Sequence, residues 1–264
     1  EYIEVPNGIA HFLEHKLFES EDGDAFTKYA KTGAYANAFT SFDKTCYLFS
    51  CSNLFYENLE ILLNFVQSPY FTEATVQKEQ GIIGQEIRMY DDSPAWRVMF
   101  NMLLAMYKNH PVRIDIAGTT ESIAKIDADL LYKCYNTFYN PSNMFLCIAG
   151  NVEADKILKM VERDIKPLAP VEIERIKPEE PDTVLKDVVE QSLAVAQPMF
   201  CFGYKLNADK IPSVKQRICT EILLEIIAGD CSPLYKTLME DGLINDDFSF
   251  EHFCGDGYNA IIFE

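Results

Sequence analysis

The stretch of this chain that says most about its fold and its chemistry is His11-Phe12-Leu13-Glu14-His15. Two of the four histidines in the 264 residues lie here, with a glutamate between them. Apolar residues at helical spacing over residues 9–18 predict a helix. Because successive residues of a helix turn by about 100°, the three polar side chains project from one face. Two imidazoles at i and i+4 can share one tetrahedral zinc ion, and the nearby carboxylate can take a proton from water.

The alternative is a solvated helix face that carries two histidines. Neighbouring Ile9, Phe12, Leu13 and Leu17 instead predict that this helix is buried. Burying two imidazoles and a carboxylate is unfavourable unless they are paired or bind a metal. The order His-x-x-Glu-His is that of the inverzincins, so we expect a metal centre. Two histidines leave a catalytic zinc one protein ligand short, and that ligand is usually a carboxylate or a thiolate.

A second predicted helix offers candidates for the third ligand. It covers residues 73–90, with Thr72 as its N-cap. Glu79 and Glu86 are two turns apart and therefore on the same face. They lie about 10 Å apart along the helix axis, so only one of them reaches the ion easily. The spacing does not choose between them, and a solvent-facing charge stripe is the alternative.

Composition and charge exclude some classes of binding partner. The chain is 48% hydrophobic and 24% charged, and 23 basic against 41 acidic residues give a net charge of −18. No apolar run approaches the roughly 18 residues of a membrane span, so we expect no membrane partner. Nucleic acid is not expected either, because phosphate contacts need clustered Lys and Arg. The acidic surface suits a basic or extended peptide. Eight cysteines without a CxxC motif predict reduced thiols and a cytoplasmic protein.

The chain shows two parts. Four of the twelve prolines fall between Lys166 and Pro181, which predicts a linker over residues 166–186 between a first domain, 1–165, and a second unit, 187–264. Further helices are predicted over residues 24–32, 53–67, 95–107, 130–138 and 214–228, with a hairpin over 36–52, a buried strand over 143–152, and strands over 191–205 and 258–264.

A resemblance to a known family rests on three segments: HFLEHKLF (11–18), NAFTSFDKTCYLF (37–49) and EQGIIGQE (79–86). Together they resemble the pitrilysin/insulinase family of zinc peptidases, most closely the branch of the mitochondrial processing peptidase and its bacterial relatives. Blocks at 110–123, 138–152 and 232–244 follow in the family's order. The resemblance implies an α+β fold, mostly antiparallel sheet with helices packed on it. Residues 1–165 would be the zinc-binding peptidase domain without its N-terminal strands, and residues 187–264 an incomplete second domain of the same type.

The resemblance also implies roles for five side chains. His11, His15 and Glu86 would bind one Zn²⁺ per chain. Glu14 would be the general base that activates water. Glu79 would support the site, for example by orienting a ligand histidine.

The implied function is a zinc-dependent metalloendopeptidase that hydrolyses extended peptides or unfolded segments. The substrate would lie as an added β-strand on an edge strand over residues 36–39, where the alternative is plain sheet core. The residues implied in this contact are Ala36, Asn37, Ala38 and Phe39. A homodimer, or a heterodimer with a related subunit, is a further expectation from the family.

Departures from the family pattern leave alternatives open. Gln85 precedes Glu86 where many relatives have a second glutamate. The second domain of family members supplies an Arg and a Tyr that this stretch lacks, so we expect a fragment that binds zinc without full peptidase activity. One alternative function is a non-catalytic partner subunit, although such subunits usually lose His-x-x-Glu-His. Another is a metal-dependent lyase of related fold with a cysteine ligand, for which Cys51 and Cys147 are the residues to test.

Overall fold

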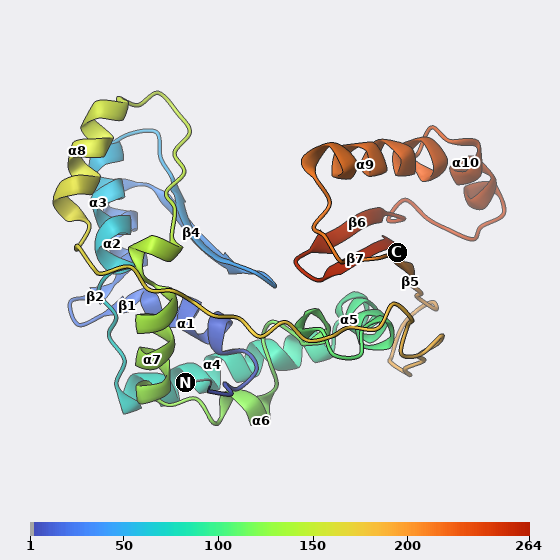
Figure 1. The fold of residues 1–264 in the computed structure, drawn as a ribbon, viewed down its shortest axis with the longest axis horizontal. Helices are drawn as coiled ribbons and strands as arrows, with labels where there is room; N and C mark the ends of the chain where they lie inside the picture. The colour runs from blue at the N-terminus through green and yellow to red at the C-terminus, as the bar shows by residue number, and fades with distance from the viewer. Residues whose placement is uncertain (1–2) are drawn as a thin grey trace. The chain divides into compact units, whose positions relative to one another are not determined.

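The computed structural model describes residues 3–264, and its contacts divide the chain into two compact units (Figure 1). The first consists of Glu1–Arg88 and Asp115–Arg175, the second of Met89–Ile114 and Ile176–Glu264. The domains predicted over residues 1–165 and 187–264 stay a prediction. Within the second unit, the Ala105 carbonyl accepts hydrogen bonds from two backbone N–H groups of the returning chain, at residues 185 and 186.

The first unit combines helices with two antiparallel hairpins, β1–β2 and β3–β4. Leu59 and Leu63 pack against Ile157 and Met160 in one part of its core. Its elements are α1 (Ile9–Leu17), β1 (Glu19–Ser20), β2 (Gly23–Asp24), α2 (Ala25–Thr32), β3 (Tyr35–Thr40), β4 (Thr45–Ser50), α3 (Phe55–Phe65), α4 (Glu73–Asp91, which runs on into the second unit), α6 (Thr120–Ile123), α7 (Ala128–Phe138), the 3-10 turn η2 (Pro141–Asn143) and α8 (Ala154–Asp164).

The second unit contains a three-stranded antiparallel sheet in the order β5-β7-β6. Its elements are α5 (Pro94–Met106), the 3-10 turn η1 (Pro111–Arg113), β5 (Phe202–Lys205), α9 (Val214–Ala228), α10 (Pro233–Glu240), β6 (Phe250–Gly255) and β7 (Tyr258–Phe263). Since the strand pairs in both units are antiparallel and helices pack with them, the α+β prediction is confirmed. None of the helices between residues 3 and 264 has the length and apolar character needed to cross a membrane.

Two helices matter most for the site. Helix α1 buries Phe12 and Leu17 completely, and α4 buries Ile83 and Ile87, as their helical periodicity predicts. The Thr72 hydroxyl accepts a hydrogen bond from the N–H of residue 75. Thr72 therefore caps the start of α4, as predicted. The buried residues of the two helices fix which face of each helix points into the core.

The entry into α1 depends on two glycines. Gly8 has φ +89°, and a Cβ atom there would lie 2.5 Å from the carbonyl oxygen of Ala117. Gly118 has φ +75°, and a Cβ atom there would overlap the carbonyl group of Asn7. Only glycine combines this backbone conformation with so close an approach. The pair holds the start of α1 against the loop before α6.

The predicted buried strand over residues 143–152 is wrong. Within the described residues no strand pairs with this segment, and it has no regular structure beyond the end of η2 at Asn143. Phe145 is 91% exposed. Apolar content alone does not make a strand, because the backbone N–H and C=O groups of a buried strand need a neighbouring strand as partner. The predicted strand over 191–205 is likewise shorter, because only Phe202–Lys205 pairs, with β7.

The second unit contains a buried ion pair that ties β5 to the loop after α5. Glu180 accepts hydrogen bonds from the backbone N–H groups of residues 108, 109 and 110, at 2.6–2.8 Å. It also pairs with Lys205 at 2.7 Å, and the two side chains are 9% and 5% exposed. Burial alone would raise the pKa of Glu180, but Lys205 and the three N–H groups lower it to about 2.

We expect Glu180→Gln to lower the free energy of unfolding at pH 7 by about 3 kcal/mol, because it leaves Lys205 buried without its counter-ion. The folded pKa of Glu180 lies below the unfolded value of about 4.3. Its stabilisation is therefore complete above that value and is lost as the pH falls toward 2. Urea unfolding from pH 7 to pH 2.5 measures both effects. The gap between wild type and variant should shrink on acidification, and a gap independent of pH would contradict the assignment. The matched control is exposed Glu179→Gln.

Candidate metal centre

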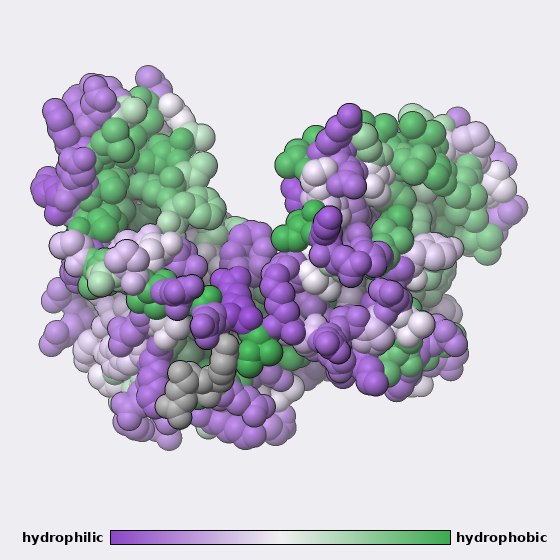
Figure 2. All heavy atoms as spheres, in the orientation of Figure 1, coloured by the Kyte–Doolittle hydropathy of each residue, from purple (hydrophilic) through white to green (hydrophobic). Residues whose placement is uncertain are grey.

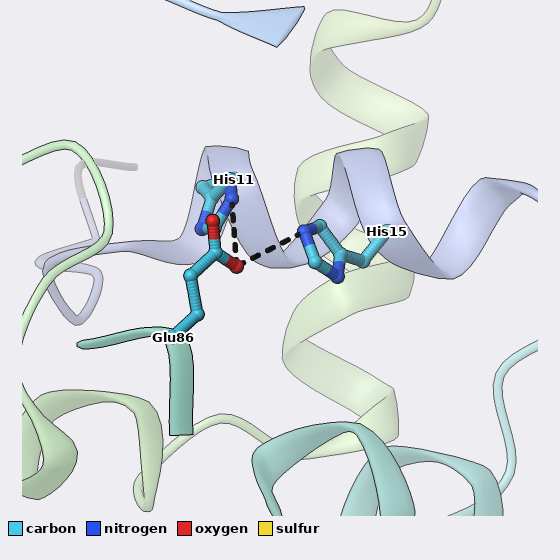
Figure 3. A group of neighbouring side chains, drawn as sticks. All are labelled: His11, His15 and Glu86. Carbon is cyan, nitrogen blue, oxygen red and sulfur yellow. Dashed lines mark ion pairs between the residues drawn. The ribbon is translucent and has the colours of Figure 1, made fainter. Parts of the chain in front are cut away.

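The two histidines of α1 lie side by side one turn apart, with ring centroids 4.6 Å from each other. Helix α4 brings Glu86 to them (Figure 3). One carboxylate oxygen of Glu86, Oε2, lies 3.7 Å from His11 Nε2 and 3.5 Å from His15 Nε2. The candidate ligand atoms of the three residues all lie within 4.8 Å of one another. The structure thus brings together the three residues that the family resemblance implied as ligands.

These distances fit a shared cation. They are longer than ordinary hydrogen bonds. Ligands held at about 2.0–2.1 Å around a tetrahedral zinc ion are roughly 3.4 Å apart. The Nδ1 atom of His11 is buried and makes no hydrogen bond within the described residues. Two imidazoles and one carboxylate are also the ligand set of catalytic zinc sites that keep a fourth position open. The residues present therefore fit a zinc ion.

Glu79 contacts the other nitrogen of the second histidine. His15 Nδ1 lies 3.0 Å from Glu79 Oε1, and Glu79 is 8% exposed. A carboxylate only accepts hydrogen bonds, so Nδ1 donates, and in the neutral ring Nε2, on the side of Glu86, keeps its lone pair. The two glutamates of α4 thus contact different nitrogens of the same ring. This is why their spacing alone did not show which of them would bind a metal.

Burial and charge shift the pKa values at this site. Burial, followed by the nearby His15, holds the pKa of His11 well below its usual value. Burial alone would also lower the pKa of His15, but Glu79 and the other carboxylates raise it above that value. Burial raises the pKa of Glu14, although a hydrogen bond from Thr40 opposes part of the rise. His11 is therefore neutral at pH 7, the form in which imidazole binds a metal.

The candidate general base lies on the same helix. Glu14 is 8% exposed, and its Oε2 atom accepts a hydrogen bond of 2.6 Å from the Thr40 hydroxyl, at the end of β3. The sequence analysis did not single out Thr40. The alternation of side chains along β3 could have found it, because Thr40 lies on the same, less exposed side as Ala36 and Ala38.

The predicted substrate strand lies in β3. Residues 36–39 pair in register with β4, opposite residues 49–46. Among the described residues no strand pairs with the other edge of β3. The Ala38 N–H donates to Asn37 Oδ1 at 2.9 Å, and the Asn37 amide donates to the Tyr35 hydroxyl. With Asn37 and Phe39 exposed and Ala36 and Ala38 half-buried, this strand is not plain sheet core. Its role in substrate binding stays a prediction.

A lysine next to the motif was not anticipated as a buried residue. Lys16 is fully buried and pairs with Glu19. Glu19 also pairs with Lys78 on α4, at 3.8 Å. Lysine is almost never fully buried without a partner, so sequence alone gives no signal for this position. Glu19 links the helix that carries the histidines to the helix that carries Glu86.

Other candidate ligands lie elsewhere. The ring of His110 bonds the carbonyl of Asp256, and that of His252 bonds Asn259. In residues 3–264 the metal-like grouping of His, Cys, Asp or Glu contains His11, His15 and Glu86 and no cysteine. The arrangement therefore gives no support to a site with a cysteine ligand.

Comparison with known proteins gives consistent matches. Residues 4–120 match the family model described as Insulinase (Peptidase family M16), and residues 125–264 match the model described as Peptidase M16 inactive domain. The chain is 49% identical over 269 residues to a Bacillus subtilis protein named uncharacterized zinc protease YmfH, covering 99% of this chain and 63% of that protein. It is 32% identical over 165 residues to uncharacterized zinc protease YmxG of the same organism, covering 60% of this chain and 39% of YmxG.

Solved structures of peptidases are similar to this chain as well. An M16-like peptidase from Alicyclobacillus acidocaldarius superposes with a TM-score of 0.95 at 40% identity, over 100% of this chain and 63% of that one. A protease from Helicobacter pylori shares the fold, with a TM-score of 0.80 at 21% identity, over 100% of this chain and 65% of its own. The chain thus spans a little under two thirds of the length of YmfH and of these two solved chains.

Proposed function

Because this chain belongs to the insulinase family of peptidases, M16, we propose that it is a zinc metalloendopeptidase acting on extended peptides. The observation that carries the proposal is the pair of distances, 3.7 and 3.5 Å, from two histidine nitrogens to one oxygen of Glu86. His11, His15 and Glu86 would hold one zinc ion. When bound, zinc supplies a Lewis acid that lowers the pKa of water and polarises a peptide carbonyl.

The chain's own residues would carry the proton transfers. Glu14 takes a proton from the attacking water and passes it to the leaving amine, as a general base and then a general acid. Its raised pKa supports this role, because a proton carrier works best when its pKa is near the working pH. Glu79 holds His15 in one tautomer through Nδ1 and so keeps Nε2 free to bind.

The substrate would bind to β3 as an added strand. Residues 36–39 offer an edge without a strand partner among the described residues. Recognition through backbone hydrogen bonds selects extended peptides and tolerates varied side chains. The outward N–H of Ala38 already bonds Asn37 Oδ1, so a bound peptide carbonyl would replace the Asn37 side chain there.

We also propose a protein partner and a reducing compartment. Apolar side chains gather over α9 (Figure 2), where Ile222 and Ile226 are 54% and 68% exposed. Surfaces of this kind favour a protein contact, in a homodimer or with a related subunit, which sedimentation velocity tests.

The proposed reducing compartment rests on the cysteines. All eight are free, which favours a cytoplasmic location for the protein. Loss of activity on adding reductant would contradict that setting.

The test of the proposed function is metal content together with cleavage. We expect one zinc per purified chain by elemental analysis. A fluorogenic peptide should be cleaved, cleavage should stop with a chelator, and added zinc should restore it. Cys51→Ser and Cys147→Ser should keep the metal, since the proposed ligands include no thiol. Zinc without cleavage would mean that this stretch holds the metal but needs further residues, such as the Arg and Tyr of the family's second domain, to cleave peptides. No zinc after loading would overturn the ligand assignment.

A further inference from the structure

One oxygen of the Glu14 carboxylate is held from a second element, the end of β3. The Thr40 hydroxyl donates a hydrogen bond of 2.6 Å to Glu14 Oε2. Glu14 extends from α1 on a flexible side chain, so its backbone position does not fix the direction of its carboxylate. The contact with Thr40 occupies one oxygen and leaves the other, Oε1, available to accept a proton.

The Thr40 hydroxyl is itself held by its partner across the hairpin. Thr40 and Thr45 are directly opposite in the β3–β4 register, and their Oγ1 atoms are 3.2 Å apart. A threonine hydroxyl has one proton to donate. Because the proton of Thr40 points to Glu14, the proton in the contact between the two threonines comes from Thr45.

We propose that Thr40 is a positioning residue for Glu14, and that Thr45 sets the direction of its hydroxyl. The catalytic consequence rests on the proposed peptidase function, whereas the hydrogen bonds from Thr45 to Thr40 and from Thr40 to Glu14 do not. Thr40 holds Oε2 of Glu14 so that Oε1 faces the reacting water. The carboxylate then does not have to reorient before each proton transfer, a kind of alignment on which rates depend strongly.

The contact itself is tested without activity, by a double-mutant cycle on thermal unfolding of the purified metal-free chain. The variants are Thr40→Val, which replaces the hydroxyl by a methyl group, Glu14→Ala, and the two combined. We expect Thr40→Val to lower Tm more in the wild-type background than in the Glu14→Ala background, because only the former contains the acceptor. Equal shifts in both backgrounds would overturn the proposal.

The positioning role is tested by kinetics on a fluorogenic extended peptide. Thr40→Val should lower kcat about 10- to 100-fold with KM and zinc content unchanged. Thr40→Ser keeps the hydroxyl and should restore most of kcat. Thr45→Val should give a smaller loss, since it leaves the Thr40–Glu14 bond in place. Wild-type kcat in Thr40→Val, or an equal loss in Thr40→Ser, would overturn the role. If wild type cleaves no peptide, the proposed function fails, and the unfolding cycle still decides whether Thr40 holds Glu14.

Discussion

His11→Ala and Glu86→Gln should each abolish zinc binding and, with it, peptide cleavage. His11→Ala removes one of the three protein ligands that the geometry offers. Glu86→Gln replaces the carboxylate near both histidine nitrogens by a neutral amide, which is not among the usual zinc ligands. Partners outside the ligand set already change metal affinity about 10- to 100-fold, so loss of a ligand should exceed about 100-fold. Titration of metal-free protein with zinc, followed by elemental analysis after gel filtration, measures the change.

Two further variants make this experiment specific. Glu73→Gln removes the same charge from an exposed position at the start of α4 and should bind zinc like wild type. Glu79→Gln should fall between, because its amide oxygen still accepts the hydrogen bond from His15 but has lost the negative charge, and no ligand atom is removed. Wild-type affinity in Glu86→Gln would sink the assignment of this residue. A complete loss in Glu79→Gln, with Glu86→Gln intact, would exchange the roles of the two glutamates.

Glu14→Gln should reduce kcat by about 10²- to 10⁴-fold, the usual contribution of a positioned general base, and leave zinc in place. Glutamine has the shape of glutamate and still accepts a hydrogen bond from Thr40, but its amide does not take up a proton. The loss should therefore be in kcat with KM little changed. Steady-state kinetics at matched zinc content measure it. A fall in kcat no larger than that of Glu73→Gln would show that another group moves the proton.

Periodic patterns predicted their helices well. Helix α1 was predicted over residues 9–18 and spans Ile9–Leu17, and α9 begins and ends as predicted. Helix α4 begins after Thr72 as its capping signal indicated. The apolar faces of these helices and the cap of α4 depend on neighbours within a few positions, so local sequence contains the information. The two histidines were found in the same way, by their spacing on one helix.

What the sequence missed depends on distant partners. The stretch 143–152 is apolar enough for a buried strand, but no described strand pairs with it. Lys16 is buried because Glu19 meets it there. Thr40 reaches Glu14 through the packing of β3 against α1, between positions 26 residues apart. Which glutamate of α4 would bind metal depends on how α1 lies against α4, and helical spacing does not contain that information.

The bond from the Ala38 N–H to the Asn37 side chain also bears on self-association. An exposed strand edge is a template on which another copy of the chain can pair. At Ala38 the outward donor is already taken by the preceding side chain, so a second edge would first have to displace Asn37. The Asn37 side chain thus opposes pairing of β3 with the same strand of another copy, and so opposes aggregation through this edge.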